Sequence, residues 1–499
     1  MLTPVPENSM TFNNIKTEKD IESILNGAGR YVVQMAKWNE QEPISRGGYT
    51  SYRGITEKKG FNLEPGFVPN AISWDPFYKV INQANIVPKF INQVELTKDR
   101  QNFYLGQAYF YKAFAYFFLI RNYGDCVLIY DDPIISAGGV AKSPWTQVAD
   151  YAIKLAENAA ALLPDFEDLT DSDGQKITYK SIPCKGAANA LLAYLCAWKA
   201  GGRWFANEDY DEMKLWRQAE LACSRVIDST DTYRLAVNPE EVVTNVLRGN
   251  SSESVYETVI MGMNHEITSY ESKIYTCGIA NMYVYNIYPV YPNATFASII
   301  TKTDHVITND DVRKMYSDGD LRRDAYFYKF NEMAALDQSI TNNWAYFYKY
   351  RYVAVYTPEE NQWMAGQWKA MDCNRVWWRL ADVILLRAEC RSRLGDDAGA
   401  IADLNRVRAR ANATPYDASE YNGDLRFAIF KEREKELLAE GQRWYDMIRN
   451  DYIRLLMGKG YQEASEQDYK DGLLFLPLQI DVNLNPKLRQ NTYWLKHAK

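Results

Sequence analysis

The stretch 432-EREKELLAEGQRWYDMIRN-450 combines helix-forming residues with several charged side chains around an aromatic centre. As one continuous helix it would place Glu436, Glu440 and Arg443 on neighbouring turns, where residues three and four apart meet. A catalytic interpretation requires an acid and a base that face a cleft, with a raised pKa on one carboxyl group. A structural interpretation requires only that the charges are paired while Trp444 is buried, because unpaired buried charges are costly. We favour the second interpretation, in which the helix docks through its charges.

The preceding stretch, 376-VWWRLADVILLRAECRSRLGDDAGAIADLNRVRARAN-412, has the spacing of two helices joined by a tight turn. Small residues lie where tetratricopeptide repeats let two helices approach, and Gly395 lies at the turn. Helical spacing of apolar residues also predicts helices at 74–94, 100–124, 143–164, 184–201 and 213–229, with Ser143 as a cap, Pro144 in a first turn and Gly124 at a C-terminus. The predicted fold class is mostly α, a tetratricopeptide-like helical repeat scaffold.

Residues 235–375 interrupt this pattern. The segments 270–296 and 341–368 are rich in Tyr, Asn, Gly, Pro and Trp without a helical period, which predicts a large irregular insert of loops and short strands. The segment 38–70 has the same character, and long loops in compact proteins usually have a function. We predict one domain over residues 1–499, with helix pairs in 1–234, a ligand-binding insert in 235–375, and further helix pairs and a closing tail in 376–499.

Composition narrows the choice of partner. The net charge is −7 and no long basic run is present, which argues against nucleic acid and acidic membrane surfaces. No stretch reaches about 18 uncharged apolar residues, so no membrane-spanning helix is predicted. The 37 Tyr and 13 Trp exceed the usual needs of a core, and both residue types form amphipathic contact surfaces.

The cysteine and histidine residues predict no metal site or cofactor. Seven Cys residues leave at least one unpaired, and Cys196, Cys223 and Cys390 lie in helical patterns that predict burial. Three His residues without a CxxC pair argue against a zinc site and a Ser-His-Asp triad. A loop around Asp171 and Asp173 is similar to a calcium-binding loop, but it lacks the closing Glu, so an ordinary polar turn is favoured.

Six segments, in order along nearly the whole chain, match landmarks of a known family. The segment 119–128 departs from the family pattern at Cys126 and Val127, where that family usually has Val-Pro. The matching segments are 2-LTPVPEN-8, the W…Y..I..AN pattern of Trp74, Tyr78, Ile81, Ala84 and Asn85, 119-LIRNYGDCVL-128, 404-LNRVRARAN-412, the ERxxELxxEGxRWxDxxR signature in 432–449, and 475-FLPLQIDVNLNPKLRQN-491. The chain thereby resembles the SusD/RagB family of surface lipoproteins, which work with TonB-dependent outer-membrane transporters of Gram-negative bacteria.

This resemblance implies nutrient capture without catalysis. The protein would bind an oligosaccharide or polysaccharide and cover a SusC-like transporter as a lid. It would be an outer-membrane, cell-surface protein, held by an N-terminal lipid anchor whose signal peptide and lipobox Cys are absent from this sequence. We expect a monomer when the chain is isolated.

The ligand is expected in the irregular segments, because sugar rings stack on aromatic side chains while amides and guanidinium groups bond their hydroxyls. These candidates come from residue type and position, since family ligand residues lie in variable loops. The candidate ligand-binding residues are Trp38, Tyr49, Tyr52, Trp204, Asn281, Tyr283, Tyr285, Asn343, Trp344, Arg351, Trp363 and Trp368.

Three other functions stay open. The protein could instead be a peptide-binding lid, as in the RagB-like branch of the family. A surface glycoside hydrolase would need an Asp/Glu pair in the aromatic cleft. A cytosolic tetratricopeptide scaffold would bind peptide tails, although the long aromatic insert argues against that class of protein.

Overall fold

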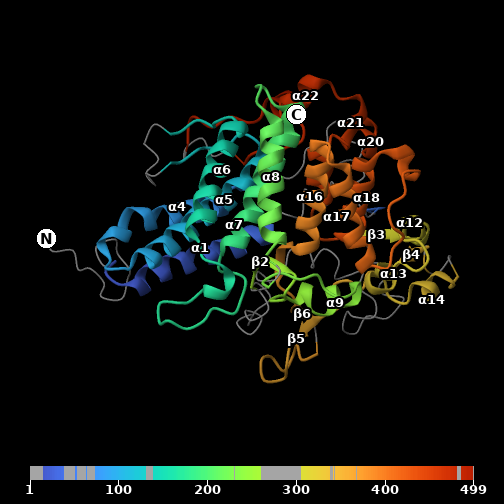
Figure 1. Cartoon of the computed structure of the whole chain (residues 1–499), viewed down its shortest axis with the longest axis horizontal. Helices are drawn as coiled ribbons and strands as arrows, with labels where there is room; N and C mark the ends of the chain where they lie inside the picture. Colours follow the sequence, from blue (N-terminus) through green and yellow to red (C-terminus); the bar gives the residue numbers. More distant parts are fainter. Residues whose placement is uncertain are drawn as a thin grey trace.

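The computed structural model of the chain describes residues 15–38, 51–52, 63, 73–130, 139–229, 231–259, 305–337, 341, 343–366, 368–479 and 485–497. Helices predominate among them, which confirms the predicted fold class. Figure 1 shows the long helices of the N-terminal half beside a second group from the C-terminal third, with short strands and helices below the second group.

In the described ranges of the N-terminal part, six long helices follow one another, and each packs against the next of the six. All but the first correspond to predicted helices. Thr97 and Asp211 cap two of them by accepting hydrogen bonds from the backbone N–H of Arg100 and Lys214, respectively. The six are α1 (Glu18–Trp38), α4 (Asp75–Phe90), α5 (Lys98–Tyr123), α6 (Trp145–Leu162), α7 (Lys185–Gly201) and α8 (Glu212–Ile227).

The predicted cap of α6 was wrong. The helix begins one residue later, after Pro144, and Ser143 instead exchanges backbone hydrogen bonds with Cys126. The carboxylate of Asp125 accepts the hydrogen bond from the backbone N–H of Trp145 at 2.9 Å. A carboxylate from the start of the connection between α5 and α6 therefore takes the place of the predicted Ser143 cap.

The C-terminal helices continue the scaffold. The helices α16 (Leu380–Leu394) and α17 (Asp397–Arg410) form the predicted helix-turn-helix, and α16 also packs on α8 and on α18 (Leu425–Glu436). Gly395 ends α16 with a φ of +83°, a left-handed conformation that glycine adopts without strain. The remaining helices are α19 (Arg443–Arg449), α20 (Ile453–Leu456), α21 (Lys459–Glu463), α22 (Glu466–Lys470) and α23 (Thr492–His497).

The insert contains the predicted short strands and also short helices that were not predicted. Antiparallel pairing joins β2 to β7, β5 to β6, and β1, β3 and β4 in one sheet of that order. Its elements are α9 (Pro239–Thr244), β2 (Ser254–Thr258), β3 (His305–Thr308), α12 (Asn309–Met315), α13 (Leu321–Tyr326), α14 (Phe330–Ala334), β4 (Trp344–Ala345), β5 (Val353–Val355), β6 (Trp368–Met371) and β7 (Arg375–Arg379), with β1 at Ser51–Tyr52.

Two hydrophobic cores correspond to scaffold and insert. The larger runs through the long helices and includes Tyr256 of β2, whose ring lies 4.7 Å from that of Phe110 on α5. The smaller gathers around Tyr326 and Phe327, inside the insert. Tyr256 thus connects β2, which pairs with β7, to α5. The division at residues 235 and 375 stays a prediction.

The stretch 432–450 is not one helix. It breaks between α18 and α19, where Ala439 has a φ of +62° and Gly441 a φ of +83°. Leu438 and Ala439 at this break join the smaller core, so burial against the insert offsets the strain at Ala439. The predicted burial of Trp444 is confirmed.

The three cysteines predicted to be buried, Cys196, Cys223 and Cys390, are buried and free of disulfides. Among the helices in the described ranges, none has the length and apolar character needed to cross a membrane.

Candidate functional site

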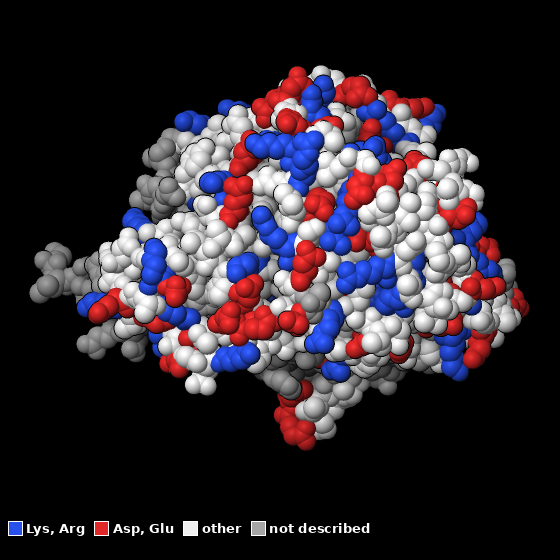
Figure 2. Space-filling view, in the orientation of Figure 1, with Lys and Arg blue, Asp and Glu red and all other residues white. Residues whose placement is uncertain are grey.

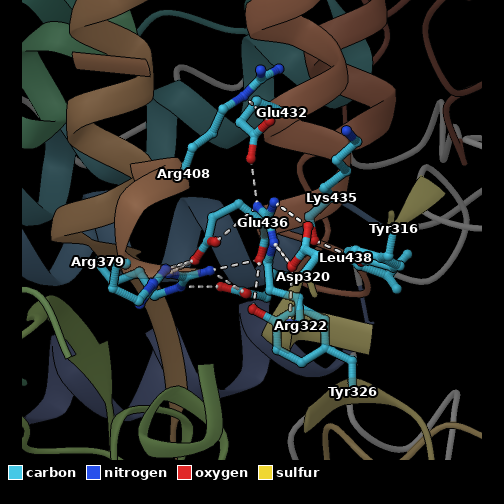
Figure 3. A network of polar contacts seen from close by, with 12 residues as sticks. Tyr316, Asp320, Arg322, Tyr326, Arg379, Arg408, Glu432, Lys435, Glu436 and Leu438 are labelled. Atoms are coloured by element: carbon cyan, nitrogen blue, oxygen red, sulfur yellow. Dashed lines mark hydrogen bonds and ion pairs between the residues drawn. The ribbon is translucent and has the colours of Figure 1, made fainter. Parts of the chain in front are cut away.

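A cluster of buried charges lies where the insert meets the scaffold (Figure 3). At its centre the carboxylate of Glu436 on α18 contacts three guanidinium groups, those of Arg379 on β7 at 2.7 Å, Arg322 on α13 at 3.3 Å, and Arg410 on α17. Glu440 pairs with Arg379 at 2.8 Å and with Lys349 of the insert at 2.6 Å. These charges therefore join insert and scaffold.

The pKa shifts oppose a catalytic role for this cluster. Burial alone would raise the pKa of both carboxyl groups. The guanidinium groups around Glu436 outweigh that effect and hold its pKa well below the usual range, while Arg379 and Lys349 lower the pKa of Glu440 to about 2. A general acid needs a raised pKa, so the docking interpretation fits and the acid–base interpretation does not. Arg443 pairs outside this group, with Glu434 at 2.6 Å.

These shifts predict acid sensitivity. A carboxyl group whose pKa is lower in the folded than in the unfolded chain stabilises the fold above its unfolded pKa, and that contribution is lost as pH falls through the folded pKa. For Glu440 the window runs from its ordinary value of 4.5 down to about 2. We expect the urea midpoint of unfolding to fall across this window. A midpoint that stays constant from pH 5 to pH 2.5 would contradict the assignment.

For seven of the predicted ligand-binding residues the structure does not describe the side chain. Tyr49, Asn281, Tyr283 and Tyr285 lie outside the described residues. The backbone of Trp38, Tyr52 and Trp368 lies at the end of α1, in β1 and in β6, respectively. Their role in binding stays a prediction.

Three further predicted residues lie inside the insert and make their contacts within it. They are Asn343, Trp344 and Arg351. The Asn343 amide accepts a hydrogen bond from Asn309 at 3.1 Å and donates one to Asp310 at 3.0 Å. Trp344 is buried in β4. Arg351 makes two hydrogen bonds to Glu240, at 2.8 and 3.0 Å. These contacts hold the fold of the insert together.

Trp204 and Trp363 lie apart from that group. The Trp204 indole N–H donates to the carbonyl of Ile448 at 3.0 Å, and its ring packs against Phe205 and Tyr469 in the helical scaffold. Trp363 lies on the projecting loop between β5 and β6, and 85% of it is exposed. Among the predicted residues whose side chains the structure describes, Trp363 has the most exposed ring.

A cavity of about 300 Å³ lies between α1, α5, the segment 179–182 and β2. Of the three irregular segments predicted to bind ligand, 38–70 begins at the end of α1 and 270–296 comes after β2 in the sequence. The cavity lining comprises Asn26, Gly29, Arg30, Val32, Val33, Tyr111, Tyr179, Ser181, Ile182, Tyr256, Glu257, Thr258 and Val259.

Tyrosine hydroxyls give this cavity its polar character. Tyr111 and Tyr256 are almost fully buried, yet their hydroxyls have no hydrogen-bond partner among the described residues. These two residues line the cavity, where a bound polar ligand could hydrogen-bond to their hydroxyls. Tyr179 is 44% exposed at the same cavity. We therefore take this cavity as the candidate ligand site.

The loop similar to a calcium site forms a tight turn. The Asp171 carboxylate accepts hydrogen bonds from the backbone N–H groups of Asp173 at 3.0 Å and Gln175 at 2.7 Å. Within the described residues, no group of three or more His, Cys, Asp or Glu side chains is arranged to hold a metal ion.

Comparison with known proteins identifies the family. A sequence profile described as "SusD family" matches residues 252–494, and one described as "Starch-binding associating with outer membrane" matches residues 5–195. The chain belongs to the SusD/RagB family. Two SusD-like proteins of Formosa agariphila are 26% identical over 86% of this chain and 81% of the relative, and 23% identical over 87% and 84%.

Solved structures of SusD-like proteins share the fold. A SusD homologue of Bacteroides thetaiotaomicron superposes with a TM-score of 0.72 at 19% identity, covering 96% of this chain and 98% of its own. A laminarin-binding SusD-like protein gives 0.70 at 19% identity, covering 95% and 99%. NanU of B. fragilis gives 0.68 at 21% identity, covering 98% and 99%.

Proposed function

We propose that this SusD-like protein binds a glycan at the cell surface and acts as a lid on a SusC-like TonB-dependent transporter, without catalysis. Membership of the SusD/RagB family supports binding, and the matched profile description supports association with the outer membrane. The laminarin-binding structural neighbour supports a carbohydrate ligand. A lipid anchor at the N-terminus and a monomeric isolated chain complete the proposal.

The observation that carries this proposal is the cavity between α1, α5 and β2. Tyr179 offers an aromatic face, and Tyr111 and Tyr256 offer hydroxyls that have no hydrogen-bond partner among the described residues. Sugars present both apolar ring faces and hydroxyl groups, so this combination suits them. The carboxylates of the charge cluster are buried in ion pairs, which supports a role in binding alone.

Calorimetric titration of the purified chain against polysaccharides, oligosaccharides and mixed peptides tests the proposal. We expect heat from at least one carbohydrate and no new reducing ends after prolonged incubation. Heat from peptides alone would favour the RagB-like alternative, and release of reducing ends would favour a hydrolase.

The exposed Trp363 gives a further test of the ligand surface. Because its ring is solvent-exposed, Trp363→Ala should change the free energy of unfolding by no more than about 0.5 kcal/mol. If the projecting loop contacts the glycan, the same variant should bind a long polysaccharide more weakly than the wild type. Unchanged polysaccharide affinity would remove Trp363 from the proposed site.

A further inference from the structure

We infer that the ligand of the cavity between α1, α5 and β2 is an anionic glycan unit, one that bears a carboxylate or a sulfate group, and that Arg30 binds this group. The inference rests on the proposed glycan-binding function and specifies its substrate class. It follows from the charges that line the cavity and from the partners that each of them already has.

Arg30 brings an uncompensated positive charge to the cavity. It lies on α1 and is exposed, and within the described part of the chain its guanidinium has no ion pair or hydrogen bond. A guanidinium group presents planar pairs of N–H donors that match carboxylate and sulfate oxygens. Arg30 could therefore bind a charged ligand without breaking an ion pair or hydrogen bond to a described residue.

The carboxylate in the lining, that of Glu257, is already saturated. It accepts hydrogen bonds from the Asn250 backbone N–H at 2.8 Å, the Ser254 hydroxyl at 2.8 Å and the Asn374 amide at 3.0 Å. The ammonium group of the buried Lys180 donates to the carbonyl of Ser254 at 2.8 Å and offsets the nearby charge of Glu257. The oxygens of Glu257 are therefore engaged within the fold, and Lys180 offsets part of its charge.

Acidic side chains near the cavity but outside its lining already accept hydrogen bonds from other residues. Glu22, near Tyr179, accepts hydrogen bonds from the backbone N–H of Ser172 at 3.2 Å and from its hydroxyl. Asp171 is held by its own turn. On the face seen in Figure 2, basic and acidic side chains are interspersed.

The remaining polar groups of the lining complete a set of donors. The hydroxyls of Tyr111 and Tyr256 lack partners among the described residues, and Asn26, Tyr179 and Ser181 add further donors. Hydrogen bonds to a charged oxygen are stronger than those to a neutral one. A volume of about 300 Å³ is at the small end for ligand pockets, which suits one charged sugar unit.

Paired titrations test the inference. The probes are oligogalacturonate for a carboxylate and a carrageenan oligosaccharide for a sulfate, set against neutral laminari- and malto-oligosaccharides. The wild type should bind at least one acidic probe more tightly than both neutral ones, and added salt should weaken that binding. The acidic probe that binds identifies the charged group.

The variant Arg30→Met should lower the affinity for the acidic probe by about tenfold to a hundredfold. Arg30→Lys should retain part of the affinity, and Lys459→Met, an equal change in net charge on the distant helix α21, should have no effect. Equal binding of neutral and acidic probes, or full affinity in Arg30→Met, would overturn the inference and leave glycan binding intact. Binding to no carbohydrate would overturn both.

Discussion

Glu436→Ala is expected to lower the free energy of unfolding by about 3–5 kcal/mol, the cost of leaving buried charge without its partner. The variant removes the carboxylate that Arg322, Arg379 and Arg410 share. Their guanidinium groups would then stay buried at the joint between insert and scaffold with less negative charge around them. Urea unfolding, followed by circular dichroism, measures the change.

Glu463→Ala is the matched control. It removes a glutamate from an exposed pair with Lys459 on α21, and such pairs contribute at most about 1 kcal/mol. If the two variants lose equal stability, the buried cluster is not the joint described above. Folded Glu436→Ala should still bind ligand, because the cluster holds the insert and does not contact the cavity.

Gly29→Phe is expected to lower the affinity for the glycan more than about tenfold, which corresponds to about 1.4 kcal/mol of binding free energy. The free energy of unfolding should not fall. Gly29 lies within α1 in the cavity wall, and a Cβ there would meet only the Tyr111 hydroxyl, at 3.6 Å. A phenyl ring at this position would occupy space that the ligand needs. Calorimetric titration and thermal unfolding of the same sample separate the two effects.

Gly29→Ala is the control for this variant. Alanine in a helix interior is about 0.5–1 kcal/mol more favourable than glycine, and its methyl group leaves most of the cavity open. The alanine variant should therefore bind as the wild type does. Wild-type affinity in Gly29→Phe would place the ligand elsewhere.

The helices were predictable because local patterns determine them. Apolar periodicity marked α4 to α8, and Gly395 marked the turn between α16 and α17. The break after α18 was missed because it depends on Ala439, a residue that rarely adopts a positive φ, and on the burial of Leu438 in the insert. Only Gly441 gave a local signal of that break.

The cavity could not be predicted for a similar reason. Tyr111 and Tyr256 lie in regular elements and resemble core residues in the sequence, and they meet only because β2 packs on α5. Arg30 lies on a helix that was not predicted. Exposed aromatic residues such as Trp363 were recognisable from loop composition, whereas Trp344 shows that the same composition also builds the core of the insert.

The most direct test is a crystal structure of the chain with the oligosaccharide that binds it most tightly. We predict a sugar unit in the cavity between α1, α5 and β2, in contact with Tyr179 and hydrogen-bonded to the hydroxyl of Tyr111 or Tyr256. A sugar bound elsewhere on the surface, with this cavity unoccupied at saturating ligand, would contradict the account.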